Sequence, residues 1–151
     1  MGMEIERKFL PKYLPENLEQ YPSHKIEQAY LNTGPVVRIR KQDDEYILTY
    51  KGGGMMARAE YNLPLNKESY YHLLEKADGN VISKTRYKIP INNELTAELD
   101  IFDGTFQGME LVEVEFKTVD DANSFQKPDW FGEDVTHDKH YHNSYLSKIK
   151  K

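Results

Sequence analysis

Hydrophobic and polar residues alternate along most of the chain, with a period of two residues. This alternation is typical of β-strands, because successive side chains point to opposite faces. The first run places Glu4, Glu6 and Lys8 on one face and Ile5 and Phe9 on the other. Similar runs span residues 24–31, 37–40, 46–51, 58–63, 84–89, 97–101 and 112–116. They predict about eight strands, enough to close an antiparallel barrel.

Turn-forming residues separate these runs, at residues 33–35, 42–44, 52–54, 78–80, 92–93 and 106–108. Helical patterns are few. One helix is expected after the N-cap candidate Asn66, and shorter ones at residues 120–125 and 143–149. The predicted fold is α+β and mostly β, an eight-stranded antiparallel closed barrel with a few peripheral helices. No linker or repeat interrupts it, so we expect a single domain over residues 1–151.

Composition narrows the class of protein. The 151 residues include 20 Lys and Arg against 25 Asp and Glu, a net charge of -5, which argues against nucleic-acid binding. No apolar run approaches the ~20 residues of a membrane span. The charged N-terminus does not resemble a signal peptide, and the absence of cysteine excludes disulfides and thiolate chemistry. We therefore expect a cytoplasmic protein without membrane or nucleic-acid partners.

Charged residues occupy the polar faces of the predicted strands, where a solvent face would also tolerate Ser, Thr, Asn or Gln. Like charges two residues apart lie about 7 Å from each other and repel unless opposite charges intervene. The acidic members of this pattern are Glu4, Glu6, Glu60, Glu98, Asp100, Glu113 and Glu115. The basic members are Lys8, Arg38, Arg40, Lys51, Arg58, Lys84 and Arg86. An outer surface decorated with charge is the alternative, but we favour a charged barrel interior.

An interior with both signs of charge suits one class of ligand. Carboxylates bind hard divalent cations such as Mg²⁺, whereas Arg and Lys bind phosphate oxygens. A single phosphate seldom needs six or seven cations, so the pattern favours a chain of phosphates bound with metal.

The residues resemble the CYTH superfamily, the triphosphate tunnel metalloenzymes. The opening Glu4-Ile-Glu-Arg-Lys8 has the signature Glu-x-Glu-x-Lys, and the later charge pairs follow in the order of the family. The last motifs are Val135-Thr-x-Asp-Lys139 and Tyr141-x-Asn143. The resemblance implies an eight-stranded tunnel that binds a triphosphate with one or two divalent ions, Mg²⁺ or Mn²⁺. The length and ending look most like the small bacterial inorganic tripolyphosphatases.

Site roles follow from the paired charges and from the resemblance. Carboxylates paired on the first and last strands, which become neighbours when a barrel closes, are expected to bind metal: Glu4, Glu6, Glu113 and Glu115. Cations are expected to clamp the phosphates: Lys8, Arg38, Arg40, Arg58, Lys84, Arg86 and Lys139. Glu98 and Asp100 are expected to orient water and hold the cations apart.

The resemblance to the tripolyphosphatase branch also implies that Tyr30 and Lys51 act together on the attacking water. The alternative is that Tyr30 is a core residue and Lys51 another phosphate clamp.

Two positions depart from the family pattern. Asn62 stands where a second Glu is common, and His140 where Arg is common. The spacing of His137, His140 and His142 is not that of a usual zinc site, so we do not expect one there.

The leading function is hydrolysis of inorganic tripolyphosphate by a monomer or homodimer, with nucleoside triphosphates as further candidate substrates. The alternatives within the family are a class IV adenylate cyclase and a thiamine triphosphatase. A rival of another class is a module that binds polyphosphate without turnover, but anion binding alone gains nothing from acidic neighbours.

Overall fold

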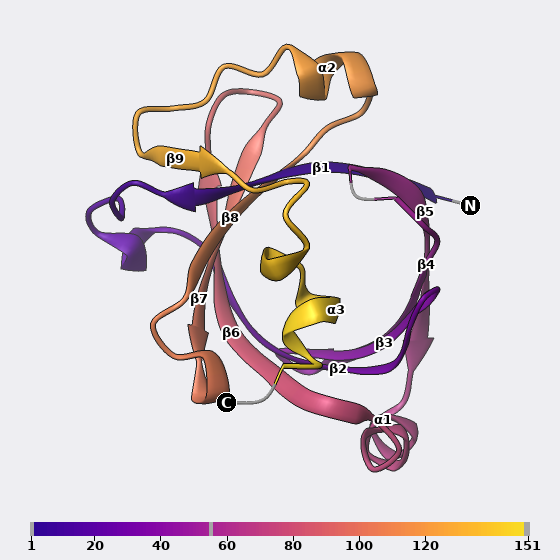
Figure 1. Cartoon of the computed structure of the whole chain (residues 1–151). Helices are drawn as coiled ribbons and strands as arrows, with labels where there is room; N and C mark the ends of the chain where they lie inside the picture. The colour runs from indigo at the N-terminus through magenta and orange to yellow at the C-terminus, as the bar shows by residue number, and fades with distance from the viewer. Residues whose placement is uncertain (1, 55, 150–151) are drawn as a thin grey trace.

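The computed structural model describes residues 2–54 and 56–149, and it is mostly β-structure. Its nine strands are β1 (Gly2–Pro11), β2 (Ser23–Thr33), β3 (Val36–Gln42), β4 (Glu45–Lys51), β5 (Ala57–Leu65), β6 (Asp78–Pro90), β7 (Thr96–Asp103), β8 (Glu110–Glu115) and β9 (Phe131–Asp134). Eight of them form a closed barrel in the order β5-β4-β3-β2-β6-β7-β8-β1, and β1 pairs back with β5 (Figure 1). The predicted antiparallel barrel is thereby confirmed.

Strand β1 closes the barrel because its two halves pair with different neighbours. Its first half pairs with β5, where Glu4 lies opposite Arg58. Its second half pairs with β8, where Glu6 lies opposite Glu115 and Lys8 opposite Glu113. The charged motifs of the first, fifth and eighth strands therefore meet on one wall.

Strand β9 was not predicted. It has four residues and pairs with the end of β1 outside the barrel. Its Phe131 packs against Phe9, with the ring centroids 5.0 Å apart, and against Phe125 and Trp130. The preceding aromatic loop thus covers a hydrophobic cluster on the outside of the wall.

The helices are short and peripheral. They are α1 (Lys67–Leu74), α2 (Val119–Asn123) and α3 (Asn143–Leu146), with 3₁₀ turns η1 (Leu18–Gln20), η2 (Gly104–Phe106) and η3 (Lys139–Tyr141). The predicted cap of α1 is present, since the Asn66 side chain accepts a hydrogen bond of 2.7 Å from the Ser69 amide. Helices α2 and α3 are shorter than the patterns suggested. No helix in the described part of the chain is long and apolar enough to cross a membrane.

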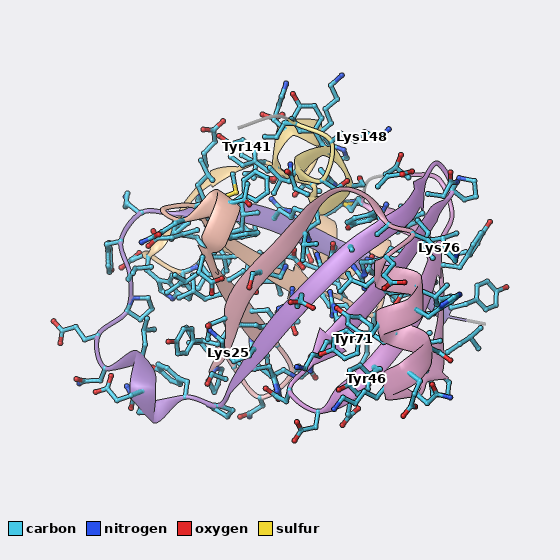
Figure 2. All side chains as sticks on the ribbon, turned by 90° about the horizontal axis from the view of Figure 1, so that it is seen from below. Lys25, Tyr46, Tyr71, Lys76, Tyr141 and Lys148 are labelled. Carbon is cyan, nitrogen blue, oxygen red and sulfur yellow. The ribbon has the colours of Figure 1, made fainter. Side chains whose placement is uncertain are left out.

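Many hydrophobic side chains of the barrel strands point outward, toward the covering segments, whereas Val36 and Ile47 line the interior. Residues Ala29 and Ile39 pack with Tyr70 of α1, and Val112, Val114 and neighbouring residues pack under α2 and β9. Figure 2 shows α1, which carries Tyr71, lying along the outer wall beside Tyr46. The alternating pattern therefore assigns the apolar residues to the outer core and leaves the charged residues inside.

The C-terminal segment covers one end of the barrel. Figure 1 shows η3 and α3 across the barrel opening, and the side view of Figure 2 shows them at one end. The Asn80 amide of β6 donates to the Ser147 carbonyl at 2.6 Å, and Leu146 is buried. Gly79 has φ 74°, and a Cβ there would overlap the Ser147 carbonyl. Only glycine allows this close approach of β6 and the C-terminal segment.

Candidate functional site

The interior of the barrel is a charged cavity of about 210 Å³. Its wall includes all but two of the residues that the sequence marked as site residues: Glu4, Glu6, Lys8, Tyr30, Arg38, Arg40, Lys51, Arg58, Arg86, Glu113 and Glu115. These residues lie on seven strands: β1, β2, β3, β4, β5, β6 and β8. The closure of the barrel brings their side chains together. The predicted charged interior is therefore present.

Lys84 and Lys139 do not line this cavity. Lys84 is fully buried, with Nζ 2.6 Å from a carboxylate oxygen of Asp100 and 5.2 Å from the ring centre of Phe102. Burial lowers the pKa of Lys84 to about 8. Lys139 is exposed on η3, beside Asp138 and His140. We therefore assign Lys84 the role of an ion-pair partner of Asp100. Lys139 lies outside the cavity, so its position does not support the phosphate contact predicted for it.

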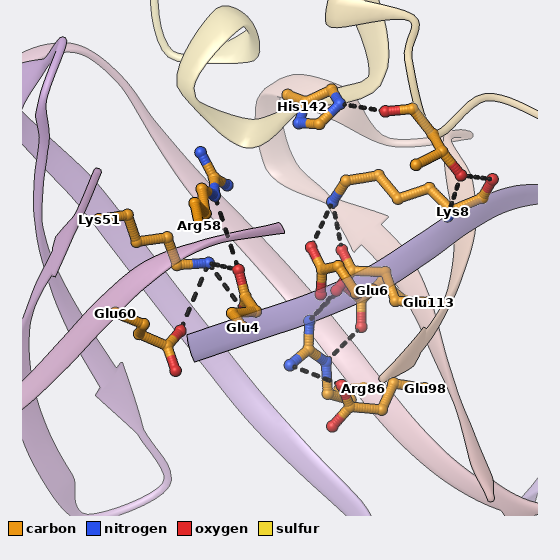
Figure 3. A network of polar contacts seen from close by, with 12 residues as sticks. Glu4, Glu6, Lys8, Lys51, Arg58, Glu60, Arg86, Glu98, Glu113 and His142 are labelled. Carbon is orange, nitrogen blue, oxygen red and sulfur yellow. Dashed lines mark hydrogen bonds and ion pairs between the residues drawn. The ribbon is translucent and has the colours of Figure 1, made fainter. Parts of the chain in front are cut away.

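One group of charges surrounds Glu4 (Figure 3). Lys51 Nζ lies 2.8 and 3.0 Å from the two oxygens of Glu4 and 3.6 Å from Glu60. Arg58 Nε lies 3.6 Å from the same Glu4 carboxylate. The ion pairs link β1, β4 and β5 across the closure of the barrel.

A second group surrounds Glu113. Lys8 Nζ lies 2.7 Å from Glu113 and 3.5 Å from Glu6 (Figure 3). Arg86 lies 3.6 Å from Glu113, and its guanidinium donates two hydrogen bonds of 2.7 and 2.9 Å to Asp100. Asp100 therefore fixes the direction of Arg86.

The carboxylates beside Lys8 are not equally neutralised. Burial raises the pKa of Glu6 to about 7, and the charge of Glu113 raises it further against the effect of Lys8. Burial also tends to raise the pKa of Glu113, but Lys8 and Arg86 outweigh it and hold that pKa well below its usual range. Burial raises the pKa of Glu115, with Glu4 and Glu60 acting in the same direction.

These carboxylates fit a divalent metal by donor chemistry. Oxygen donors are what Mg²⁺ and Mn²⁺ bind, and a metal would supply the positive charge that Glu6 and Glu115 lack. Within residues 2–54 and 56–149, no three acidic or histidine ligands are already gathered in a metal-like cluster. Lysine ammonium groups hold the carboxylates instead, so metal binding requires Lys8 or Lys51 to give up some of these contacts.

Among the described residues, no carboxylate forms an ion pair with Arg38 or Arg40 of β3. Arg40 donates to the neutral amide oxygen of Gln28 at 3.1 and 2.9 Å, and burial, with Arg38 and Arg86 nearby, lowers the pKa of Arg40. Arg38 Nε is buried and has no hydrogen-bond partner among the described residues. Uncompensated guanidinium groups in a buried wall indicate an anion site.

Tyr30 and Lys51 line the same cavity. Tyr30 lies opposite Arg38 in the pairing of β2 with β3, and only 3% of it is exposed. Burial lowers the pKa of Lys51, and Arg38 adds to this, against the opposing charges of Glu4 and Glu6. Tyr30 also packs in the hydrophobic cluster with Leu146 of the C-terminal segment.

Two further residues of the predicted charged interior, Glu60 and Glu98, also line the cavity. The wall residues that the sequence did not mark for the site are Val36, Ile47, Thr49, Asn62, His142, Asn143 and Ser144. Asn62 accepts a 2.6 Å hydrogen bond from Thr49 and donates one of 3.3 Å to Glu60, so a neutral amide occupies this place in the wall. The last three come from the segment that covers the barrel end, which no strand periodicity marks.

Similar sequences of known proteins identify the family of this chain. The sequence matches the CYTH domain over residues 2–151. The chain belongs to the CYTH family. An inorganic triphosphatase of Nitrosomonas europaea is 38% identical over 148 residues, which cover 95% of this chain and 96% of that protein. An inorganic triphosphatase of Acetivibrio thermocellus is 34% identical and covers 98% of this chain and 95% of its own length.

A solved crystal structure of an inorganic triphosphatase has the same fold. It superposes with a TM-score of 0.73 and 35% sequence identity, over 99% of this chain and 97% of that chain. The CYTH domain therefore occupies the whole described chain, and the charged cavity lies inside that domain.

Proposed function

We propose that this CYTH protein hydrolyses inorganic tripolyphosphate to orthophosphate and pyrophosphate with the help of a divalent metal. The observation that carries the proposal is the cavity, in which carboxylates on β1 and β8 face guanidinium groups on β3 and β6. Acidic groups would weaken a site that only binds anions, whereas a metal joins them to the phosphates. The full-length relatives named inorganic triphosphatase support the same substrate.

The proposed metal is Mg²⁺ or Mn²⁺, as one or two ions. The ligands would come from Glu4, Glu6, Glu113 and Glu115, which share the β1–β8 wall. Bound there, the metal would neutralise phosphate charge that builds up during the reaction.

The proposed phosphate clamp consists of the cations that line the cavity. These are Lys8, Arg38, Arg40, Arg58 and Arg86. A tripolyphosphate carries several negative charges, more than one or two metal ions neutralise. In the described part of the chain, no carboxylate forms an ion pair that would compete for Arg38 or Arg40. Each well-formed charge-assisted contact contributes about 1.5–3 kcal/mol.

For water activation we propose Lys51 with Tyr30. The lowered pKa of Lys51 supports this role, because a Lys that is neutral for part of the time can accept a proton. The bidentate contact with Glu4 favours the charged form, so a metal that engages Glu4 would release Lys51 for this role.

The test is a substrate panel with the purified protein. Tripolyphosphate, ATP and thiamine triphosphate are each incubated with Mg²⁺, Mn²⁺ or Ca²⁺, and released phosphate and cyclic AMP are measured. We expect phosphate and pyrophosphate from tripolyphosphate, at a higher kcat/KM than for the organic triphosphates, and no turnover in EDTA. Formation of cyclic AMP as the main product would indicate a cyclase. Tight binding without turnover of any substrate would indicate a binding module.

A further inference from the structure

His142 belongs to the cavity wall but was not part of the predicted site. It stands just before α3, in the segment that covers the barrel end, and 7% of it is exposed. The two ring nitrogens have different surroundings. Nε2 lies 2.8 Å from the Thr136 carbonyl oxygen, which can only accept a hydrogen bond, so Nε2 carries the proton. Nδ1 has no hydrogen bond to any described residue.

Thr136 holds this ring in place. Its hydroxyl accepts a 2.9 Å hydrogen bond from the Lys8 amide and lies 2.6 Å from a carboxylate oxygen of Asp134. The His142 carbonyl accepts hydrogen bonds from two amides of α3, and the His142 amide donates to the Lys139 carbonyl of η3. In Figure 3 the second ring nitrogen is turned away from Thr136, toward the side of Arg58. These hydrogen bonds therefore hold the ring so that the lone pair of Nδ1 faces the charged cavity.

The surroundings of His142 favour the neutral form of the ring. Burial lowers its pKa, and Lys8 of β1 and Arg58 of β5 act in the same direction. The Thr136 carbonyl and Glu113 of β8 oppose them without reversing the direction. A neutral imidazole with a free Nδ1 is a proton acceptor at pH 7, where a Lys bound to a carboxylate is protonated.

Asn143 adds a second polar group to the same part of the wall. It lines the cavity and is 8% exposed, and its Oδ1 has no hydrogen-bond partner among the described residues. A buried amide oxygen without a partner is uncommon and favours a bound water or substrate hydroxyl as its donor. Two acceptors on adjacent residues fit a water molecule better than a phosphate oxygen, which has no proton to donate.

We propose that His142 is a second proton acceptor of this site, which binds the attacking water together with Asn143. This inference rests on the proposed function. The water oxygen forms a bond to the terminal phosphorus, and its proton passes to Nδ1 of His142. The bond from that phosphorus to the bridging oxygen breaks, and pyrophosphate leaves with the electron pair. The imidazolium then returns its proton to the leaving pyrophosphate or to solvent.

The critical variant is His142→Gln, with His140→Gln as the matched control. Glutamine retains an N–H that can donate to the Thr136 carbonyl but provides no base. His140 is exposed, is bonded to Asp138 and does not line the cavity. Because a general base contributes roughly a hundredfold or more, we expect kcat of His142→Gln to fall at least about a hundredfold at pH 7, with KM for tripolyphosphate within about threefold. His140→Gln should match the wild type.

The pH profile separates a base from a structural residue. The wild type should keep its kcat through neutral pH and lose it as His142 becomes protonated in the acid range. In His142→Gln the neutral plateau should disappear, and the remaining activity should rise only into the alkaline range through Lys51. Asn143→Ala should lower kcat about tenfold without moving the profile, because it removes one hydrogen bond and no titrating group.

Imidazole ¹⁵N NMR of the metal-free protein provides a measurement that does not depend on turnover. We expect the Nε2–H tautomer of His142 at pH 7. An imidazolium at that pH, or a His142→Gln protein with wild-type kcat and an unchanged profile, would overturn the inference. A wild type without phosphate release from tripolyphosphate would instead refute the proposed function.

Discussion

Lys51 Nζ lies 2.8 and 3.0 Å from the two oxygens of Glu4, although the two residues are 47 positions apart in the chain. The contact spans the seam where β1 meets β5, since Glu4 lies opposite Arg58 and Lys51 opposite Glu60. It couples a proposed metal ligand to a proposed proton acceptor. Any metal that draws Glu4 away therefore also changes the charge state that Lys51 prefers.

The first prediction separates true phosphate clamps from surface cations. Arg38→Gln removes a buried guanidinium whose Nε has no partner in the described protein, so KM for tripolyphosphate should rise tenfold or more, because about 1.4 kcal/mol corresponds to a factor of ten. Lys139→Gln changes an exposed residue outside the cavity and should leave kcat and KM as they are. Steady-state kinetics at fixed Mg²⁺ measures both. An equal loss in the two variants would contradict the geometric assignment.

The second prediction concerns the metal-binding carboxylates. Glu6→Gln and Glu115→Gln remove facing carboxylates of β1 and β8, so each should abolish turnover and raise the Mg²⁺ concentration needed for tripolyphosphate binding. Glu133→Gln, an exposed residue of β9, is the control and should behave as the wild type. Calorimetric titration of tripolyphosphate, with and without Mg²⁺, measures binding apart from turnover. Full activity of both variants would refute this ligand set.

Ligand binding should also stabilise the fold. Burial lowers the pKa of Arg40, and the guanidinium groups of Arg38 and Arg86 lower it further, as expected where cations repel one another in the free cavity. Tripolyphosphate with Mg²⁺ at 100 times its Kd should add about 2.7 kcal/mol to the free energy of unfolding, which raises the melting temperature by several degrees. Thermal unfolding with and without the ligand measures the shift. The absence of a shift at millimolar ligand would count against a triphosphate cavity.

The fold could be predicted because alternation specifies which face each residue occupies. The pattern could not specify which of the side chains on that face line the cavity. Lys84 and Arg86 share a face of β6, but Lys84 is fully buried against Asp100, whereas Arg86 lines the cavity. The pattern was equally uninformative about His142, which enters the site because the chain turns back over the barrel end. Strand β9 has four residues, too few for an alternating pattern to be recognised.

The buried pair of cations around Asp100 gives a prediction for stability. Burial alone would raise the pKa of Asp100, but Arg86 and Lys84 outweigh it and hold that pKa below its usual value. A carboxyl whose pKa is lower in the folded state stabilises the protein above the unfolded pKa of about 3.9, and this contribution is lost as the pH falls through the folded pKa. Asp100→Asn should therefore cost about 3–5 kcal/mol at pH 7, and less below pH ~3.

The control for this variant lies on the same strand. Asp103→Asn alters a residue paired at 3.6 Å with Lys25, whose side chain is 73% exposed, so the free energy of unfolding should change by about 0.5 kcal/mol or less. Urea unfolding at pH 7 and pH 3 provides the comparison. A cost for Asp100→Asn that is the same at both pH values would show that the loss comes from packing and not from charge.

The last prediction tests Lys51. Lys51→Arg keeps a positive charge on β4 beside Glu4 and Glu60, but an arginine does not release its proton in the accessible pH range. If Lys51 accepts a proton from water, kcat of the wild type should rise into the alkaline range, because its lowered pKa brings the neutral form into reach there. Lys51→Arg should lose that rise and keep only the plateau that His142 supports, while still binding tripolyphosphate. Lys41→Arg, an exposed residue of β3, should change neither quantity. A Lys51→Arg protein with near-normal kcat and an unchanged profile would make Lys51 a phosphate clamp, and the proton of the attacking water would then pass to another group in the wall.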